Sequence, residues 1–166
     1  MTISRKAAKP RPLSEADRRI LRVLQTEGRI PNVELAERVG MAPSPCLRRV
    51  KALEADGIIK GYEARISRRA VGFGVLAFVQ VNLARHTDEE AGRFEEEVAR
   101  LEEVTECHAL TGDYDFLLRI VARDLDDLAD SIMRRLLRLP GLKDVRSSIV
   151  LDVVKDAPPV PVALIA

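Results

Sequence analysis

The 166-residue chain is 46% apolar and only 4% aromatic, and its formal net charge is +1. That length fits one domain or two small ones, and the scarcity of aromatic rings argues against a platform that stacks single-stranded bases. The chain contains no apolar run of about eighteen residues and no apolar signal segment, so we expect a cytoplasmic protein that does not cross a membrane.

The small net charge hides a strong division between the two halves of the chain. Residues 1–70 hold 16 Lys and Arg against 8 Asp and Glu, whereas residues 71–166 hold 11 against 18. Such asymmetry indicates that the first half faces a polyanion and that the second half does something else. The alternative is a chance split of solvated surface charge.

Residues 1–12 are basic and contain proline, which predicts a disordered arm. Residues 13–61 then predict a domain of three helices. Ser14 is suited to cap the first helix, with Asp17 in the place of a capping-box acid, and this helix should run to about Glu27. Asn32 is suited to cap the second helix.

The third helix is predicted to begin at Ser44, with Pro45 at its first helical position, and to end near Asp56, before Gly57. A tight corner at Gly40 separates it from the second helix. The apolar residues of the three helices are spaced to share one modest core, which we expect to contain Ile20, Leu24, Leu35, Val39, Leu47, Val50, Leu53 and Ile58.

The third helix has a polar and basic face. Ser44, Arg48 and Lys51 recur at i, i+4 and i+7, which places them in one stripe, with Leu47, Val50 and Leu53 on the other side. A helix with a core face and a face of hydroxyl and guanidinium donors fits the major groove of DNA. The sequence therefore predicts binding to double-stranded DNA.

Each candidate contact follows from the chemistry of its side chain. Arginine donates two hydrogen bonds to guanine or clamps a phosphate, lysine suits phosphate, and Ser44 at the helix start can bond phosphate together with free backbone N–H groups. Cys46 is better explained as a small packed residue, and the alternative for the whole set is ordinary solvated polar positions. The candidate DNA-binding residues are Asn32, Ser44, Pro45, Arg48, Arg49 and Lys51.

Residues 62–74 predict a linker strand and connector, the strand beginning near Ile58 and running to about Ile66. Residues 75–156 then read as strand, helix, strand, strand, helix, strand, over 75–83, 88–101, 104–110, 116–121, 125–139 and 145–154. That order is the ferredoxin-like βαββαβ arrangement, so the fold class is α+β. In the second helix, Leu125, Leu128, Ala129, Ile132, Leu136 and Leu139 align.

A sheet with both helices on one side leaves its other face uncovered. That face should bear several of Leu76, Phe78, Leu117, Val121 and Val150, and a second copy of the chain is the simplest cover for it. Residues 157–166 form an apolar, Pro-rich tail that we expect to be extended, either frayed or packed on a neighbouring subunit.

Two stretches resemble one family. RIPNVELAERVGMAPSPCLRRVKALEADGIIKGY and LEEVTECHALTGDYDFLLRIVARD are similar to the Lrp/AsnC, or feast/famine, transcriptional regulators of bacteria and archaea. The resemblance implies a winged helix-turn-helix joined to a C-terminal domain for oligomerisation and amino-acid response. It also implies homodimers that often assemble into octamers, and an amino-acid effector bound between dimers beside the G-D-x-D loop.

By position in the family pattern, the effector-site candidates are Ala109, Thr111, Gly112, Asp113, Tyr114, Asp115, Leu125, Ser148 and Ile149. Leucine-responsive members carry a bulky aromatic where Ser148 stands, so their effector preference is not transferred. A carboxylate of the loop can receive an α-amino group and turn N–H groups can receive a carboxylate, but the choice between Asp113 and Asp115 stays open. Without the family, the loop is a plain β-turn.

Rival functions have weaker support in the sequence. An enzyme would have to use Asp113 with Asp115, or Cys107 with His108, and no nucleophile–base set or phosphate loop accompanies either pair. Adjacent strand residues point to opposite faces, so Cys107 and His108 do not share a metal ion. We therefore expect a sequence-specific regulator, not an enzyme, with no cofactor or metal. The alternatives are a nucleoid organiser of low sequence preference and an amino-acid-binding module without DNA function.

Overall fold

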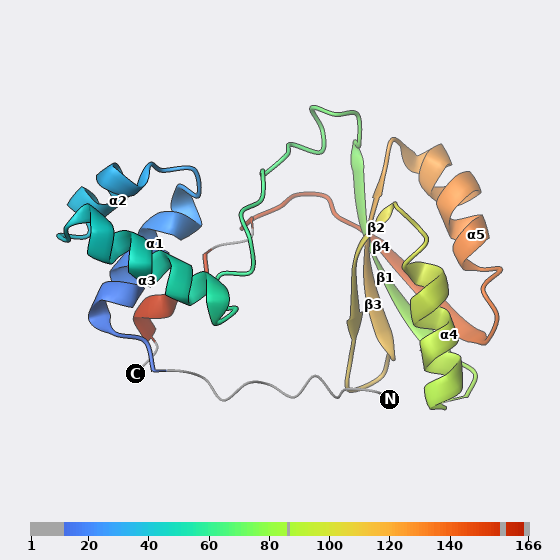
Figure 1. The fold of residues 1–166 in the computed structure, drawn as a ribbon. Helices are drawn as coiled ribbons and strands as arrows, with labels where there is room; N and C mark the ends of the chain where they lie inside the picture. The colour runs from blue at the N-terminus through green and yellow to red at the C-terminus, as the bar shows by residue number, and fades with distance from the viewer. Residues whose placement is uncertain (1–11, 86, 157–158, 165–166) are drawn as a thin grey trace. The chain divides into compact units, whose positions relative to one another are not determined.

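The computed structural model describes residues 12–85, 87–156 and 159–164. Contacts divide the chain into two units, shown with their elements in Figure 1. Of the described residues, the helical unit holds 12–65, 155–156 and 159–164, and the sheet unit holds 66–154. The arm predicted over residues 1–12 lies outside the described residues except for Pro12. None of the helices in the described ranges is long and apolar enough to cross a bilayer.

The helical unit contains α1 (Glu15–Thr26), α2 (Asn32–Arg38), α3 (Pro43–Ala55) and the short η2 (Val162–Leu164). The capping box predicted for α1 is confirmed, because the Ser14 hydroxyl accepts from the Asp17 N–H at 3.2 Å and the Asp17 carboxylate accepts from the Ser14 N–H at 3.0 Å. Gly57, at φ +69°, follows the last turn of α3, so the predicted helix end is also confirmed.

Two predicted caps are wrong. Helix α2 has Pro31 at its N-cap, which has no side chain that can accept a hydrogen bond, so Asn32 is the first helical residue; its Nδ2 atom donates to the Pro43 carbonyl at 2.9 Å. Helix α3 begins at Pro43, with Ala42 as its N-cap, so Ser44 lies inside the first turn. Proline fits at the first helical position because it has no N–H to leave unpaired there, and here that proline is Pro43.

The core of the helical unit differs from the prediction at Leu47, which is 42% exposed, whereas Cys46 is fully buried, as expected for a small packed residue. A helix that begins at Pro43 turns Cys46, Val50 and Leu53 inward and leaves Leu47 on the solvent side. The tail also enters this core, since Val162 is only 6% exposed and packs in the same cluster as Ile20 and Leu35. The tail, which we expected to be extended, therefore forms the short η2 turn and adds Val162 to the core of the helical unit.

The strand predicted over residues 58–66 is wrong. The N–H groups of Ile58 and Ile59 both donate to the Leu53 carbonyl, at 2.9 and 3.1 Å, and continue the end of α3. Residues 60–66 are irregular backbone, because a strand needs a hydrogen-bonded partner and none of the strand pairings in the described residues includes them.

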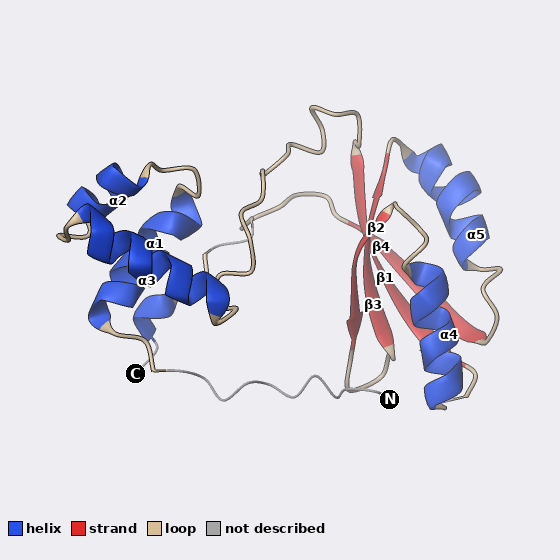
Figure 2. Cartoon of the chain, viewed as in Figure 1, coloured by secondary structure: helices blue, strands red, loops and turns tan. Residues whose placement is uncertain are grey.

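The sheet unit confirms the ferredoxin-like order, with the strands arranged β2-β3-β1-β4 and every neighbouring pair antiparallel. Helices α4 and α5 lie on the same face of the sheet (Figure 2). The elements are β1 (Val75–Leu83), α4 (Asp88–Val98), β2 (Val104–Ala109), β3 (Phe116–Ala122), η1 (Asp127–Met133), α5 (Arg134–Leu136) and β4 (Leu142–Ile149).

The second helix of this unit contains a π-helical segment, η1, which changes its buried side. Leu128, Ile132 and Leu136 are buried, whereas the predicted inward positions Leu125 and Ala129 are exposed. The wider π turn alters the angular spacing of side chains, so a period of 3.6 does not describe this helix.

The last strand begins and ends earlier than the predicted range of 145–154. β4 runs Leu142–Ile149, because β1 offers pairing positions only from Leu83 back to Ala77. One further hydrogen bond, from the Val150 N–H to the Leu76 carbonyl at 2.8 Å, ends the ladder.

The sheet face away from the helices is only partly apolar. Leu76 and Val121 are paired across β1 and β3 and are buried, and Leu117 is half-buried. Phe78 is 36% exposed and has Ser148 opposite it on β4. Part of the predicted uncovered surface is therefore present, centred on Phe78.

Candidate functional site

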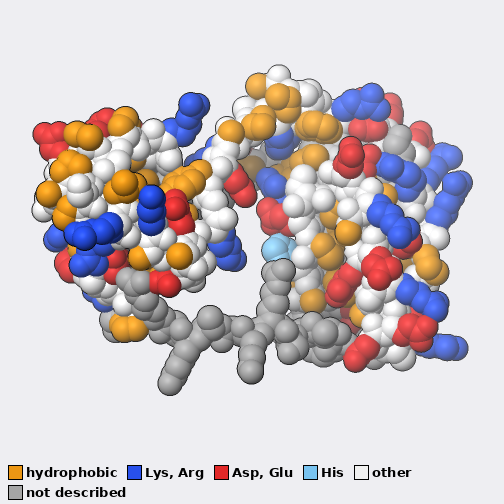
Figure 3. All heavy atoms as spheres, viewed as in Figure 1, with side chains coloured by type: hydrophobic (Ala, Val, Ile, Leu, Met, Phe, Trp, Pro, Cys, Tyr) orange, Lys and Arg blue, Asp and Glu red, His pale blue; other side chains and the backbone are white. Residues whose placement is uncertain are grey.

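The exposed side of α3 carries a continuous stripe of four side chains. Ser44, Leu47, Arg48 and Lys51 are all exposed and recur at i, i+3, i+4 and i+7. Lys and Arg side chains gather on part of the visible surface of the helical unit (Figure 3). The predicted stripe is formed, and Leu47 joins it as a residue that sequence reasoning assigned to the core.

The start of α3 has few free backbone donors. Pro43 and Pro45 have no N–H groups, and the Cys46 N–H already donates to the Ala42 carbonyl at 3.1 Å. The backbone N–H of Ser44 and its hydroxyl are therefore the donors at this end, fewer than the set of free N–H groups expected from the sequence. Asn32 fixes the end from the side through its bond to Pro43.

Arg49 lies apart from the stripe. Its Nη1 atom is 3.0 Å from Oδ1 of Asp17 and 3.0 Å from the Ser14 hydroxyl, so its side chain reaches the start of α1. Asp17 is 1% exposed. Burial opposes ionisation of this carboxyl, but hydrogen bonds from Ser14 and Arg49 and the charge of Arg49 outweigh burial and lower the pKa of Asp17.

The loop of residues 110–115 connects β2 to β3. The Leu110 N–H donates to the Asp115 carbonyl at 2.8 Å and closes the loop, and Gly112 has φ +120°, a conformation that L side chains rarely adopt. Thr111 and Asp113 are exposed. The loop thus presents a threonine, a glycine backbone and one carboxylate to solvent.

The carboxylate of Asp115 has a structural contact. Its Oδ2 atom accepts from the Leu83 N–H at 2.8 Å, while the Asp115 N–H donates to the Val81 carbonyl at 3.0 Å and to Oδ1 of Asn82 at 3.1 Å. These bonds tie the loop to the end of β1. Asn82 was not foreseen, since its role depends on the pairing of strands far apart in sequence.

Tyr114 is half-buried and lies beside Arg146, a residue that, like Asn82, was not predicted from the sequence. The Arg146 guanidinium carbon lies 5.8 Å from the centre of the Tyr114 ring, within the range of a cation–π contact. Arg146 comes from β4, opposite Gln80 of β1.

The remaining effector-site candidates lie at the other end of the sheet. The loop joins β3 at Phe116, opposite Val81, whereas Ser148 and Ile149 lie opposite Phe78 and Ala77. Ala77 and Val81 are about 13 Å apart along the strand. Leu125 follows the far end of β3 and is 55% exposed. A single chain therefore brings together Ala109 and residues 111–115, and does not bring Leu125, Ser148 or Ile149 to them.

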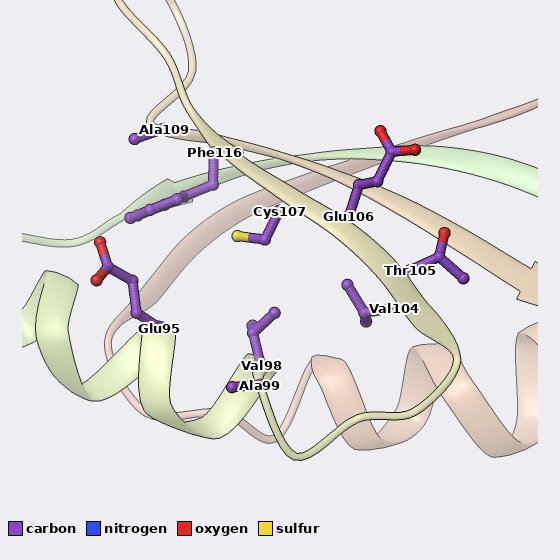
Figure 4. A pocket seen from close by; sticks show the side chains of 9 residues that line it. All are labelled: Glu95, Val98, Ala99, Val104, Thr105, Glu106, Cys107, Ala109 and Phe116. Carbon is purple, nitrogen blue, oxygen red and sulfur yellow. The ribbon is translucent and has the colours of Figure 1, made fainter. Parts of the chain in front are cut away.

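A pocket of about 320 Å³ lies between α4 and β2 (Figure 4). Its lining includes Glu95, Glu106 and Cys107, and no basic side chain that could pair with the carboxylate of an amino acid. Burial, and secondarily the charge of Glu95, raise the pKa of Cys107 to about 11. Ala109 is the one effector candidate that lines this pocket.

A three-helix unit with a basic outer stripe, joined to a ferredoxin-like sheet unit, defines a DNA-binding regulator with a separate ligand domain. Two protein-family models match the chain and agree with this division. The model described as winged helix-turn-helix DNA-binding matches residues 13–60, and the model described as Lrp/AsnC ligand binding domain matches residues 76–160. The chain belongs to the Lrp/AsnC family of transcriptional regulators.

Relatives match over nearly the whole chain. It is 41% identical to the leucine-responsive regulatory protein of Escherichia coli K12 over 153 residues, which cover 90% of this chain and 93% of that protein. A Neisseria meningitidis transcriptional regulator, solved as an L-Met complex, is 40% identical with a TM-score of 0.85, covering 90% and 96% of the two chains. An AsnC family regulator of Agrobacterium tumefaciens is 32% identical with a TM-score of 0.87, covering 93% and 100%.

Family membership settles the class of activity. The chain is a transcription regulator and not an enzyme, as the sequence predicted. Among the described residues no group of three or more His, Cys, Asp or Glu side chains is placed to hold a metal ion. Cys107 lies opposite the buried Leu118 and His108 opposite Leu117 of the other face, so these two neighbours point apart.

Proposed function

We propose that the exposed stripe of α3 enters the major groove of duplex DNA and reads its sequence. The observation that carries this proposal is the division of α3 into a buried face (Cys46, Val50 and Leu53) and an outer face of hydroxyl, guanidinium and ammonium groups. Such a helix can be held rigidly by the unit behind it while its outer side chains meet base edges.

Within this interface each side chain has a distinct role. Arg48 donates to a guanine edge, Lys51 and Ser44 contact phosphates, and Leu47 contacts a thymine methyl group. Pro45 adds apolar contact at the helix start, and Asn32 acts by holding the Pro43 carbonyl. The protein works on the DNA of the cytoplasm as pairs of copies, since two-fold dimers present two such helices to two half-sites.

We infer that the pairing surface is the sheet face away from the helices. Phe78 is partly exposed at its centre, and Leu117 beside it is half-buried. A second copy of the same face would cover both residues in an isologous contact. Further assembly of dimers into an octamer would follow the family pattern.

The effector is an amino acid bound between copies, and the separation of the candidate residues supports this. Along the strands, about 10 Å separates Ser148 from the loop and about 13 Å separates Ile149 from it within one chain, and Leu125 follows the far end of β3, so a contact between subunits would bring these residues to the loop of another copy. Ligand binding there would shift the balance between assemblies according to its different affinity for each.

Within the loop, Asp113 is the better candidate to receive the α-amino group, because it is exposed whereas Asp115 already accepts from Leu83. Backbone N–H groups of residues 111–114 would receive the ligand carboxylate. L-methionine is the first ligand to test, since a Neisseria relative was solved as its L-Met complex.

The DNA test is selection of bound duplexes from a random pool, with and without L-methionine, followed by fluorescence anisotropy of the recovered duplex and a scrambled one. The Arg48→Ala variant should bind the recovered duplex more weakly by about 1–3 kcal/mol and lose preference at one base position. Unchanged binding to both duplexes would remove Arg48 from the interface. A preference below about tenfold at 150 mM salt would favour a nucleoid organiser over a sequence-specific regulator.

The effector test is calorimetric titration of L-methionine into wild-type protein and the Asp113→Asn variant, with sedimentation velocity at each ligand concentration. We expect wild-type protein to bind and change its assembly, and the variant to bind at least about tenfold more weakly. Equal binding by the two proteins would exclude Asp113. If wild-type protein binds neither L-methionine nor any other standard amino acid titrated in the same way, the site is wrong.

A further inference from the structure

We propose that Arg49 is a positioning residue: through its ion pair with Asp17 it fixes the rotation of α3, and it does not contact DNA itself. This inference rests on the proposed role of α3 in DNA binding. It assigns to Arg49 a different role from that of its neighbour Arg48.

The first support is the placement of the two groups. Arg49 Nη1 lies 3.0 Å from Oδ1 of Asp17 and 3.0 Å from Oγ of Ser14, so one nitrogen joins α3 to the first turn of α1. The arginine side chain is 41% exposed, whereas that of Asp17 is 1% exposed. The pair therefore crosses from the surface of α3 into the interior of the helical unit.

The second support is that the Asp17 carboxylate is held from both sides. Its Oδ2 atom accepts from the Ser14 N–H at 3.0 Å and from the Ser14 hydroxyl at 2.7 Å, and its Oδ1 atom accepts from Arg49. A buried carboxylate is costly unless it is hydrogen-bonded and paired with a cation. Moving Arg49 away to a phosphate would leave Asp17 with a poorer set of partners.

The third support is the geometry of α3. Residues advance by about 100° per position on a helix, so Arg49 lies between the outer stripe and the buried face of Cys46, Val50 and Leu53. The apolar contacts of that buried face are non-directional. The ion pair is directional, as is the bond from Asn32 to the Pro43 carbonyl at the start of the helix, and it opposes rotation of α3 about its own axis at the middle of the helix.

A small rotation matters for base reading. Side chains extend about 5–6 Å from a helix axis, so a turn of about 20° moves their ends by about 2 Å. That displacement is enough to break the hydrogen bonds that Arg48 would make to a base. Contacts to phosphates, which carry little sequence information, are less affected because lysine side chains adjust.

The test measures the salt dependence of DNA binding. A lost phosphate contact lowers the slope of log K against log salt by about 0.9, whereas a lost positioning contact leaves the slope unchanged. Fluorescence anisotropy from about 50 to about 200 mM KCl would compare wild-type protein with Arg49→Gln, Asp17→Asn, the double variant and the matched control Lys51→Gln. The probes are the duplex recovered from the random pool and its scrambled form.

We expect Arg49→Gln and Asp17→Asn each to weaken binding to the recovered duplex about tenfold, with a slope equal to that of wild-type protein and little change on the scrambled duplex. The double variant should lose no more than either single variant, because both changes remove one contact. Lys51→Gln should lower the slope by about 0.9 on both duplexes.

The inference is overturned if Arg49→Gln lowers the slope as Lys51→Gln does, or if the losses of Arg49→Gln and Asp17→Asn add in the double variant. Should Arg49→Gln fail to fold, Arg49→Lys keeps the charge within reach of Asp17, and it should restore the wild-type slope and bind within about threefold of wild-type protein. A lower slope or a larger loss for this folded variant would equally reject the inference. If Lys51→Gln and Arg48→Ala both bind as wild-type protein does, the proposed α3 interface is wrong instead.

Discussion

Replacement of Asp115 separates a structural role from an effector role at the same loop. The Asp115 carboxylate accepts from the N–H of Leu83, a residue that is only 2% exposed and lies where the β1–β4 register shifts. Asp115→Ala leaves this buried donor without its acceptor, at a cost of about 1–3 kcal/mol. For a unit of this size the melting temperature should fall by about 5–20 °C.

Asp115→Asn is the matched control because its amide oxygen can still accept from Leu83. It should cost about 1 kcal/mol at most, the difference between a charge-assisted and a neutral hydrogen bond. Asp113→Asn, at an exposed position, should leave the melt unchanged. The assay is differential scanning calorimetry of the full chain at pH 7, in which the two units can melt separately.

Two results would contradict this reasoning. If Asp115→Ala has the same melting temperature as wild-type protein, the hydrogen bond between Asp115 and Leu83 does not stabilise the loop. If Asp115→Asn keeps its stability but loses L-methionine binding while Asp113→Asn retains it, then Asp115 and not Asp113 receives the ligand amine.

Three further predictions use other parts of the chain. Val162→Ala should destabilise the helical unit by about 1–2 kcal/mol and leave the sheet-unit transition in place, since it removes two buried methyl groups; calorimetry with an exposed control, Val160→Ala, checks this. Cys107 should be alkylated by iodoacetamide at pH 8 about tenfold more slowly than a thiol of pKa 9.0, because its smaller thiolate fraction is partly offset by a more nucleophilic thiolate, and mass spectrometry should detect fast labelling if that is wrong. Because the pKa of Asp17 is lowered below 3.8, its stabilising effect is complete above that pH and is lost as the pH falls through its folded value. The stability gap between wild-type protein and Asp17→Asn should therefore narrow in acid urea titrations, and a constant gap would refute the pairing.

Local patterns in the sequence were sufficient for several elements. The Ser14–Asp17 capping box and the alternation along residues 75–83 depend on neighbouring residues alone, and both the start of α1 and the extent of β1 were predicted correctly. The order of strands and helices then followed from the chain topology.

Local sequence patterns did not predict which side chains are buried by tertiary packing or which distant residues pair. Hydrophobicity favoured Leu47 for the core, but Leu47 is exposed, whereas its neighbour Cys46 is buried, as predicted for a packed residue. On a helix, the position of Cys46 relative to Val50 and Leu53 was the signal that could have corrected the prediction. The inward turn of Arg49 depends on Asp17, which lies 32 residues earlier in the chain.

The candidate effector residues were located in sequence but could not be placed relative to one another. The loop of residues 111–115 was recognised as a turn between strands, and its bond to Leu83 required the register of β1. Leu125, Ser148 and Ile149 came from the family pattern alone. Periodicity within one chain carries no information about which surfaces of two copies meet.

The burial of Val162 has a consequence for the order in which the protein matures. A ribosome makes residues 13–60 early, but the residue that completes their core emerges only after all of the sheet unit has been translated. The helical unit of the nascent polypeptide therefore lacks the buried side chain of Val162 until the sheet unit has been synthesised. Synthesis in this order completes the core of the helical unit only after the sheet unit has been made.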